Sequence, residues 1–376
     1  MTKKRILVLT DNYPWGHRSI AKAIFGFLKS KERERNFRVD YSEVKMEVGW
    51  GEDLYIWIYR YIPVTNRIAH KLMLNETARE MAEKISVLNV NNLRRVINRY
   101  KPDLVISAYF FHSHGLAEIR KKEEGKFELW TVVADPWTMN PISYVKEADL
   151  HLVYDEKGLE MGLKLGIERK KILVSGWWTR AEMFKRYDRN LARRKLGIDD
   201  ERPVVFVGGG SLGTNSITKI LPVLLLIKRK MAVVFNTGVD RLGYGLVQQY
   251  IKLFRKLRKD NLIMIKNMGW IENMGEVLAA CDIVFGKAGP NFLFDTVAAG
   301  KPFVAITHIG GQEDGNIDLI RKKKLGWVKE KNGEVGKFLL DYLAETEKYN
   351  QKFAESIKSE AERNSKSLPM LWNLLK

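Results

Sequence analysis

The sequence predicts an α/β protein of two doubly wound domains, each with a parallel sheet, that face each other across a cleft. The chain has 376 residues, more than a single hydrophobic core usually holds. Short apolar runs rich in β-forming residues alternate with helical stretches, as they do in parallel sheets. The alternation starts again at Val204–Val207, where another strand runs into a group of glycines. Two domains of similar architecture are therefore expected.

The first domain is expected to cover residues 1–175. It opens with a strand at Ile6–Thr10, a loop at Asp11–Gly16 and a helix from about residue 19 to residue 30. Five further strands are predicted at Phe37–Tyr41, Leu104–Ser107, Leu129–Val133, His151–Val153 and Ile172–Val174. Open parallel sheets bind ligands beyond the carboxyl ends of their strands, so the loops that follow these strands are expected to form the site.

The second domain is expected to cover residues 204–345, after a polar linker at residues 176–203. Its strands are predicted at Val204–Val207, Ala232–Asn236, Leu262–Ile265, Ile283–Phe285 and Pro302–Ile306. Residues 346–376 are expected to form a final amphipathic helical region, interrupted near Pro369.

Composition limits the partners and the compartment. The net charge is +19, which favours acidic partners such as nucleic acid, an anionic membrane face or a nucleotide diphosphate. The sequence carries no recognisable nucleic-acid-binding module, so nucleic acid is disfavoured. The single cysteine, Cys281, cannot form an internal disulfide and is expected to be a packed thiol. No apolar run approaches the roughly 20 residues of a spanning helix, so we expect a cytoplasmic protein that is at most peripheral to a membrane.

Two segments of the second half together indicate a nucleotide-sugar site. In the first, Gly289 lets the backbone approach a phosphate closely, and a helix that begins near Asn291 directs its first amides at that phosphate. In the second, Gln312, Glu313 and Asn316 supply amide and carboxylate groups suited to sugar hydroxyls and a base edge. Taken alone, the second segment favours a polar surface turn. The order of the two segments favours the nucleotide sugar.

The motifs and their order resemble those of a family of glycosyltransferases with the GT-B fold. They are Gly16-His17-Arg18, Val132-Val133-Ala134-Asp135-Pro136, Gly208-Gly209-Gly210-Ser211-Leu212-Gly213, Gly269-Trp270-Ile271, Lys287-Ala288-Gly289-Pro290 and Gly311-Gln312-Glu313. The family, similar to glycosyltransferase family 28, includes monogalactosyldiacylglycerol synthases, processive diacylglycerol glucosyltransferases and, more distantly, the lipid II-forming N-acetylglucosaminyltransferase. The resemblance implies two Rossmann-like domains and a C-terminal helix that returns to the N-terminal, acceptor-binding domain.

Two residues are candidates for proton transfer in an inverting reaction. His17 lies where the first strand's loop enters a helix, and a neutral imidazole accepts a proton near pH 7. By resemblance it matches the histidine that ends the family's glycine-rich loop, although Asn12 to Trp15 replace the usual glycines. Asp135 ends another strand and is its partner or a rival base. The alternatives are a histidine that only forms a structural hydrogen bond and an aspartate that only caps a helix.

The donor is expected to bind the second half, and no obligatory cofactor or metal is expected. The proposed donor-binding residues are Gly209, Gly210, Ser211, Lys287, Gly289, Pro290, Asp295, Gln312, Glu313 and Asn316. Asp295 matches the family's ribose-binding glutamate but is one methylene shorter. His112 and His114 are two positions apart and lack a companion ligand in a known zinc pattern, so a role in lining a cleft is favoured over a metal site.

An aromatic and basic stretch is the expected acceptor and membrane surface. Residues 50–84 interleave aromatic rings with basic side chains, a composition suited to an anionic lipid surface. The alternative is an ordinary amphipathic helix pair with a solvated face. The acceptor and membrane candidates are Trp15, Trp57, Tyr59, Arg60, Arg67 and Lys71.

The resulting hypothesis is an inverting, UDP-sugar-dependent hexosyltransferase that acts on the hydroxyl of a lipid or lipid-linked acceptor. It would be peripheral at the inner face of the cell membrane, with no nucleic-acid partner. Two alternatives stay open, namely a UDP-sugar 2-epimerase on the same fold and a non-catalytic protein that binds nucleotide sugars.

Overall fold

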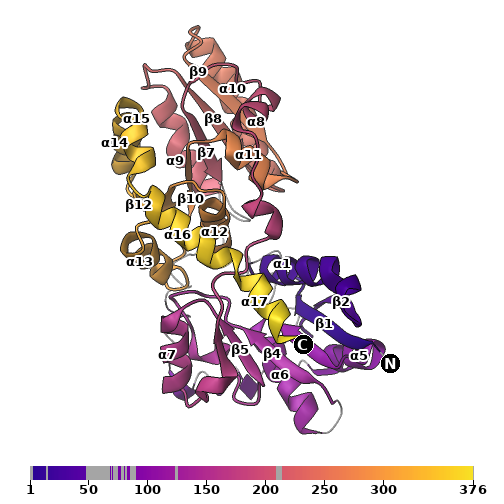
Figure 1. Cartoon of the computed structure of the whole chain (residues 1–376). Helices are drawn as coiled ribbons and strands as arrows, with labels where there is room; N and C mark the ends of the chain where they lie inside the picture. The colour runs from indigo at the N-terminus through magenta and orange to yellow at the C-terminus, as the bar shows by residue number, and fades with distance from the viewer. Residues whose placement is uncertain are drawn as a thin grey trace. The chain divides into compact units, whose positions relative to one another are not determined.

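The computed structural model describes residues 3–13, 16–47, 68, 70, 75–77, 80, 83–84, 90–122, 126–208 and 214–375. Its contacts divide the chain into two compact units (Figure 1). The first unit comprises residues 1–181, 309–315 and 363–376, and the second comprises residues 182–308 and 316–362. Each unit is built around its own six-stranded parallel sheet.

The sheet of the first unit has the strand order β2-β1-β3-β4-β5-β6. Its strands are β1 (Lys4–Asp11), β2 (Phe37–Val44), β3 (Leu104–Ser107), β4 (Glu128–Val132), β5 (Leu150–Val153) and β6 (Ile172–Val174). The helices between them are α1 (Gly16–Lys31), α5 (Val90–Tyr100), α6 (Phe110–Lys121) and α7 (Glu156–Lys164), with short 3-10 turns η1 (Glu32–Glu34), η2 (Pro141–Ser143) and η3 (Arg169–Lys171). Six consecutive side chains of β1, from Ile6 onward, are buried, as expected for a central strand covered on both faces.

The sheet of the second unit has the order β12-β11-β10-β7-β8-β9. Its strands are β7 (Val204–Gly208), β8 (Met231–Asn236), β9 (Ile263–Met268), β10 (Ile283–Lys287), β11 (Phe303–Thr307) and β12 (Gly326–Val328). Its helical elements are η4 (Ala181–Phe184), α8 (Arg189–Lys195), α9 (Thr214–Leu224), α10 (Arg241–Leu257), α11 (Met274–Ala280), α12 (Pro290–Ala298), α13 (Asp314–Lys322), α14 (Asn332–Ala344), α15 (Thr346–Gln351) and α16 (Ala354–Ser365), the last of which leads into α17 (Ser367–Leu374).

The side chains of β7 alternate between the two layers of helices that cover this sheet. Val205 and Val207 belong to one apolar core with residues of α9, α10 and α14. Phe206 points the other way and stacks against Phe292 of α12, with ring centroids 5.9 Å apart. Because successive side chains of a strand point to opposite faces, α12 covers the face opposite to α9 and α10.

The C-terminal helix returns to the first unit, as the family resemblance predicted. The backbone N–H of Trp177 donates to Oδ1 of Asn364 over 2.9 Å, and Oγ of Ser367 donates to the Trp177 carbonyl over 2.8 Å. Further along, the guanidinium of Arg35 lies 4.3 Å from the ring centre of Trp372. Buried hydrogen bonds and a cation–π contact thus fix α17 to this unit.

The predicted sheets are confirmed, and two details differ. All eleven predicted strands are present. The twelfth strand, β12, was not predicted, because it has only three residues and its Gly-Trp-Val sequence carries little strand signal. The stretch predicted as a linker, residues 176–203, contains η4 and α8. Arg193 of α8 is buried and donates to the carbonyls of Asp200 and Arg202. Arg189 donates to Oδ1 of Asp282 over 2.6 Å, so α8 is fixed to the second unit. Cys281 is a buried thiol, as expected.

Candidate functional site

His17 lies in the first turn of α1, just beyond the carboxyl end of β1, and only 8% of its surface is exposed. Its Nδ1 is 2.9 Å from the carbonyl oxygen of Ala108. A carbonyl oxygen can only accept a hydrogen bond, so Nδ1 carries the proton and Nε2 of the neutral ring keeps its lone pair. The ring packs edge-on against Tyr109, with centroids 5.1 Å apart. The imidazole is therefore held in the tautomer that a general base needs.

Asp11 is a functional candidate that the sequence analysis missed. It is the last residue of β1 and is fully buried. Thr10 donates to its Oδ1 over 2.9 Å, while Oδ2 has no hydrogen-bond partner among the residues that the structure describes. Burial raises the pKa of Asp11, and the nearby His17 partly offsets that rise. A buried carboxylate left half-satisfied beside a histidine is costly, which marks this position as one kept for chemistry.

Asp135 follows β4, and its side chain is partly exposed. Loss of hydration raises the pKa of this carboxyl to about 6, with an opposing contribution from His17 and a further increase from Glu313. Both carboxylates therefore act electrostatically on the same imidazole. The next residues are held in place because Nε1 of Trp137 donates to Oδ2 of Asp155 over 2.8 Å.

Arg18, beside the candidate base, is held by an ion pair at the end of β2. Its Nε donates to Oε1 of Glu43 over 2.6 Å, and the hydroxyl of Tyr41 donates to the same oxygen over 2.7 Å. Glu43 pairs in register with Thr10, so the ion pair ties the first turn of α1 to the sheet edge where His17 lies. This arrangement orients the start of the helix rather than supplying chemistry itself.

The predicted anion-binding helix of the second unit is α12. Gly289 is its N-cap residue and Pro290 follows at its first position, with no side-chain hydrogen bond to cap it. The start of this helix directs the positive end of its dipole toward the strand ends, which suits an anion. Phe292 lies so close to the strand ends that a Cβ on Gly208 or Gly286 would come within 2.4 or 2.5 Å of its ring. Only glycine fits there, so Gly208 serves to seat this helix.

Asn316 joins α13 to the same loop. Its Nδ2 donates to the carbonyl of Ala288 over 2.8 Å, which fixes the orientation of the amide. The other amide atom, Oδ1, is buried and has no hydrogen-bond partner within the described part of the chain, and the side chain as a whole is 1% exposed. A buried acceptor of this kind next to the start of α12 fits a ligand that brings a hydroxyl or N–H donor.

The other predicted donor-site residues lie in two places. Lys287 ends β10 and is partly buried, and Asp295 lies on α12, so both accompany Gly289 and Asn316 in the second unit. Gln312 and Glu313 belong to residues 309–315, which pack with the first unit. Glu313 is buried, and its Oε2 accepts from the backbone N–H of Ile309 over 2.8 Å, so it closes its own loop.

Several predicted positions lie outside the described residues. They are Gly209, Gly210 and Ser211 of the glycine-rich loop, and Trp15, Trp57, Tyr59, Arg60, Arg67 and Lys71 of the acceptor and membrane surface.

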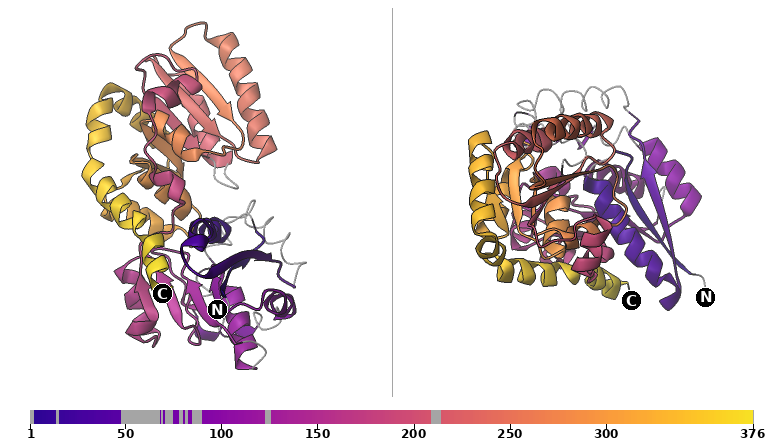
Figure 2. Two further views of the ribbon diagram at one scale, coloured as in Figure 1. Left: turned by 45° about the vertical axis from the view of Figure 1, so that its right-hand side comes forward. Right: turned by 90° about the horizontal axis from the view of Figure 1, so that it is seen from above.

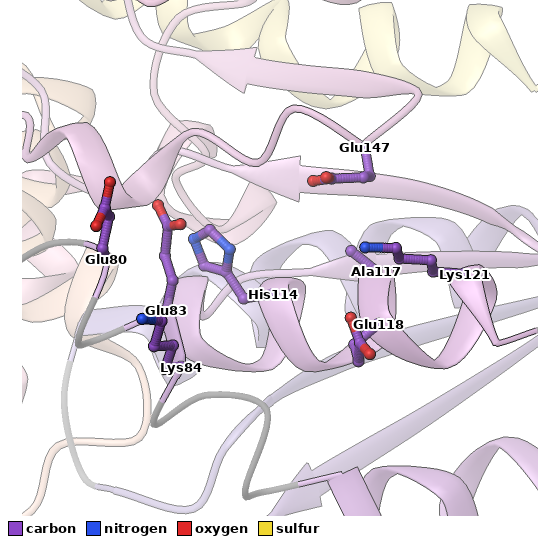
Figure 3. A pocket seen from close by; sticks show the side chains of 8 residues that line it. All are labelled: Glu80, Glu83, Lys84, His114, Ala117, Glu118, Lys121 and Glu147. Carbon is purple, nitrogen blue, oxygen red and sulfur yellow. The ribbon is translucent and has the colours of Figure 1, made fainter.

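The two histidines of α6 have different surroundings. His112 is fully buried, and its Nε2 donates to the Val44 carbonyl over 2.9 Å. His114 lines a cavity of about 250 Å³ with Glu80, Glu83, Lys84, Ala117, Glu118, Lys121 and Glu147 (Figure 3). Its Nε2 donates to the Ile142 carbonyl over 2.9 Å. Within the described ranges, no group of three or more histidine, cysteine or acidic side chains is arranged to hold a metal ion.

Two family models match consecutive parts of the chain. Residues 17–177 match the monogalactosyldiacylglycerol (MGDG) synthase family, and residues 204–368 match the glycosyltransferase family 28 C-terminal domain. The junction of the matches, residues 178–203, almost coincides with the stretch predicted as a linker. The resemblance inferred from the motifs is confirmed.

Curated relatives extend over nearly the whole chain. Monogalactosyldiacylglycerol synthase 1 of Arabidopsis thaliana is 25% identical over 367 residues, which cover 92% of this chain and 66% of that protein. This chain thus spans slightly less than two thirds of the plant enzyme's length. Processive diacylglycerol beta-glucosyltransferase of Bacillus licheniformis is 22% identical over 95% of this chain and 91% of its own length.

Solved structures confirm the fold. A glycosyltransferase from Rickettsia africae superimposes with a TM-score of 0.59 at 13% identity, covering 100% of this chain and 97% of its own. A structure assigned as a UDP-N-acetylglucosamine 2-epimerase from Listeria monocytogenes gives 0.62 at 14% identity, covering 99% and 95%. Both kinds of enzyme share this fold, so the overall fold alone does not separate the two reactions.

Proposed function

We propose that the chain is a GT-B glycosyltransferase of the kind that the motifs indicated, since its first half matches the MGDG synthases and its second half matches the glycosyltransferase family 28 C-terminal domain. The proposed reaction transfers a hexose from a UDP-sugar to a hydroxyl of a lipid or lipid-linked acceptor with inversion. The relatives named for transfer to diacylglycerol cover nine tenths of this chain or more. Diacylglycerol, a small apolar molecule with one free hydroxyl, is the proposed class of acceptor.

The observation that carries the proposal is the state of His17. Its Nδ1 is occupied by the Ala108 carbonyl, and its Nε2 keeps a lone pair beside two carboxylates. In the proposed reaction, Nε2 removes the proton of the acceptor hydroxyl as the hydroxyl oxygen bonds to the anomeric carbon. The bond from that carbon to the diphosphate breaks, and UDP leaves with the electron pair. Asp11 and Asp135 stabilise the imidazolium that results.

The donor is proposed to bind the second unit. The start of α12 directs the positive end of its helix dipole at the proposed diphosphate position, and Lys287 adds a positive charge at the end of β10. Asn316 Oδ1 would accept a hydrogen bond from a donor hydroxyl or the base, which satisfies the buried atom. Asp295 is proposed to contact the ribose. Glycine-rich loop residues 209–211 are proposed to complete the diphosphate site, which would need no obligatory metal.

Membrane attachment is proposed to be peripheral and to involve residues 50–84 at the cytoplasmic face. None of the helices in the described ranges is both long and apolar enough to cross a bilayer. A lipid acceptor still has to leave or bend out of the bilayer to react, so an enzyme with this acceptor works at the membrane surface.

The 2-epimerase on the same fold is the second candidate function. The Listeria structure favours it as strongly as the glycosyltransferase structures do on fold alone. Together the two family models cover the chain except for its ends and residues 178–203. Both models describe glycosyltransferase families. Transfer to an acceptor therefore has the stronger support.

The deciding experiment offers the purified protein radiolabelled UDP-galactose, UDP-glucose or UDP-N-acetylglucosamine with diacylglycerol in detergent micelles. One donor should give a labelled lipid and an equal amount of UDP. Conversion of the sugar without a labelled lipid would establish the epimerase instead. UDP binding by calorimetry without turnover on any donor would contradict both enzymes and favour the non-catalytic binding protein.

A further inference from the structure

Helix α10 carries a row of exposed leucines on a face that does not contact the core. Leu242, Leu246, Leu253 and Leu257 are 76%, 39%, 52% and 61% exposed. Their spacing of four, seven and four residues places them along one side of the helix. The core-facing side is a different row, formed by Gly243, Val247, Ile251 and Phe254, which are all buried. The helix therefore has two apolar faces, and only one of them is covered by this unit.

The loop after α9 adds two exposed leucines near the end of α10. Leu225 and Leu226 in this loop are 39% and 69% exposed. The guanidinium of Arg258, directly after α10, donates to the carbonyls of Leu224 and Ile227, which fixes this loop at the end of the helix. Figure 1 and Figure 2 show α10 alongside β8 and β9, the strands at one edge of the sheet. We call the leucines of α10 and of this loop, with the basic residues between Lys228 and Lys259, the α10 surface.

The charge of this region is strongly positive. From Leu224 to Asp260 the sequence has nine lysines and arginines and two aspartates. One of the aspartates, Asp260, is paired with Arg258. Lys252, Arg255 and Lys256 are exposed on α10 itself. At 100° per residue, Lys252 and Lys256 flank the row of leucines, and Arg255 lies on the other side of the helix.

We propose that the α10 surface is a docking site for an anionic lipid membrane, separate from the stretch at residues 50–84. Leucines at the surface of a bilayer enter the boundary between headgroups and acyl chains, and adjacent lysines and arginines pair with anionic headgroups. The charge excess decides between occupants, because a second copy of this basic surface would repel the first. A neutral membrane or an apolar protein would not use the charge. The proposal does not depend on the transfer reaction.

The experiment relies on the single native cysteine, Cys281, being buried and unreactive. Burial raises the pKa of the Cys281 thiol to about 12, so it stays unreactive in the folded protein. Leu253→Cys can then be labelled selectively with an environment-sensitive nitrobenzoxadiazole dye. The matched control is Leu191→Cys on α8, a leucine 45% exposed on a helix that packs against α11. On vesicles with about one third phosphatidylglycerol, the dye at position 253 should shift to the blue and the dye at position 191 should not.

Two sets of variants test the two parts of the surface. Lys252→Gln with Lys256→Gln should weaken vesicle binding on the order of thirtyfold at low salt, since each basic residue near an anionic surface contributes about 1 kcal/mol, roughly a factor of five. The control removes two exposed charges elsewhere in the unit, with Lys337→Gln and Lys352→Gln, and should change binding much less. Leu246→Gln with Leu253→Gln should reduce binding about tenfold while circular dichroism shows an intact fold.

Three results would overturn the proposal. Vesicle sedimentation without a blue shift at position 253 would place the docking site elsewhere. A blue shift that depends on protein concentration without vesicles would identify a second copy as the occupant. Equal binding to neutral vesicles would remove the role of charge. Transfer to detergent-dispersed acceptor should stay unchanged in all these variants, so failure of the docking proposal and failure of the transfer reaction are distinguishable.

Discussion

The carboxyl ends of the two sheets have the same architecture and different chemistry. In the first unit, the strand ends present the ionisable groups Asp11, His17 and Asp135, and loss of hydration raises the pKa of both carboxyls. In the second unit, the edge around Gly289 and Asn316 presents the start of a helix and a neutral side-chain amide. We propose that the first edge moves a proton and that the second holds an anion.

The difference has a physical cause. A buried carboxylate is costly unless a partner compensates it, so such groups persist only where their titration is useful. An anion site needs no titratable group, because amides at a helix start provide positive charge that does not depend on pH. Substitutions should therefore affect turnover in the first unit and donor affinity in the second. Each of the following experiments tests that separation.

The largest effect is expected from His17→Ala. Loss of the proposed base should reduce kcat by roughly a hundredfold or more, because general-base catalysis typically contributes factors of this size. The Kd for UDP, measured by calorimetry, should stay within about twofold of the wild type. Full activity in the variant would remove the assignment of the base. Weakened UDP binding would instead show that the two edges are not chemically separate.

Asn316→Leu should have the next largest effect, on donor affinity. It removes a buried acceptor that none of the described residues satisfies, so the Kd for UDP or the UDP-sugar should rise on the order of tenfold. Asn364→Leu is the matched control, since that buried asparagine also has one hydrogen bond to backbone and one unsatisfied amide atom but lies in the first unit. An equal loss in both variants would point to general destabilisation.

Asp11→Asn should lower kcat by about tenfold while leaving the Kd for UDP unchanged. The substitution keeps the shape of the side chain and removes the charge that stabilises the imidazolium. The pH–rate profile separates this electrostatic role from a structural one. If Asp11 acts through its charge, the pH at which the base becomes competent should shift in the variant. A uniform loss at every pH would identify Asp11 as a purely structural group.

The sequence was sufficient for the fold and for the position of part of the candidate site. The strands were predictable because buried parallel strands are continuous apolar runs, and His17, Asp135 and Gly289 could be placed at strand ends because they follow such runs. Asp11 was missed because nothing in its sequence context separates a buried aspartate from a loop residue. The role of Gly208 was missed because its neighbour, Phe292, is 84 positions away in the chain, and only the folded sheet brings them together.

Glu313 shows the opposite problem, a sequence pattern that suggested a role without being specific to it. Its place beside Gln312 and Asn316 predicted a sugar ligand, whereas the structure shows one of its oxygens accepting from Ile309 within the same loop. A carboxylate near glycines has the same sequence signature in either role, so the pattern alone does not distinguish them. The role of Glu313 toward the donor stays a prediction.

The smallest effect is expected on the stability of the free protein, from Asp135→Asn. The pKa of this carboxyl is about 6 in the folded protein and 3.8 in the unfolded reference, so the folded state binds more protons between pH 4 and pH 6. Stability contributed by this group therefore falls as pH rises through that window and stays low above it. The variant removes this pH dependence and should be more stable than the wild type at pH 7.5, with little difference at pH 4. The expected gain at pH 7.5 is only about 1 kcal/mol, because the Asp135 side chain is still partly open to water. Urea unfolding at the two pH values measures both differences.

Asp200→Asn provides the contrast, since the hydrogen bond from Arg202 lowers the pKa of Asp200 to about 2, and that variant should gain nothing at pH 7.5. A variant Asp135→Asn that is equally or less stable at pH 7.5 would mean that the first sheet's edge does not store unfavourable charge, and the contrast with the second unit would lose its energetic basis.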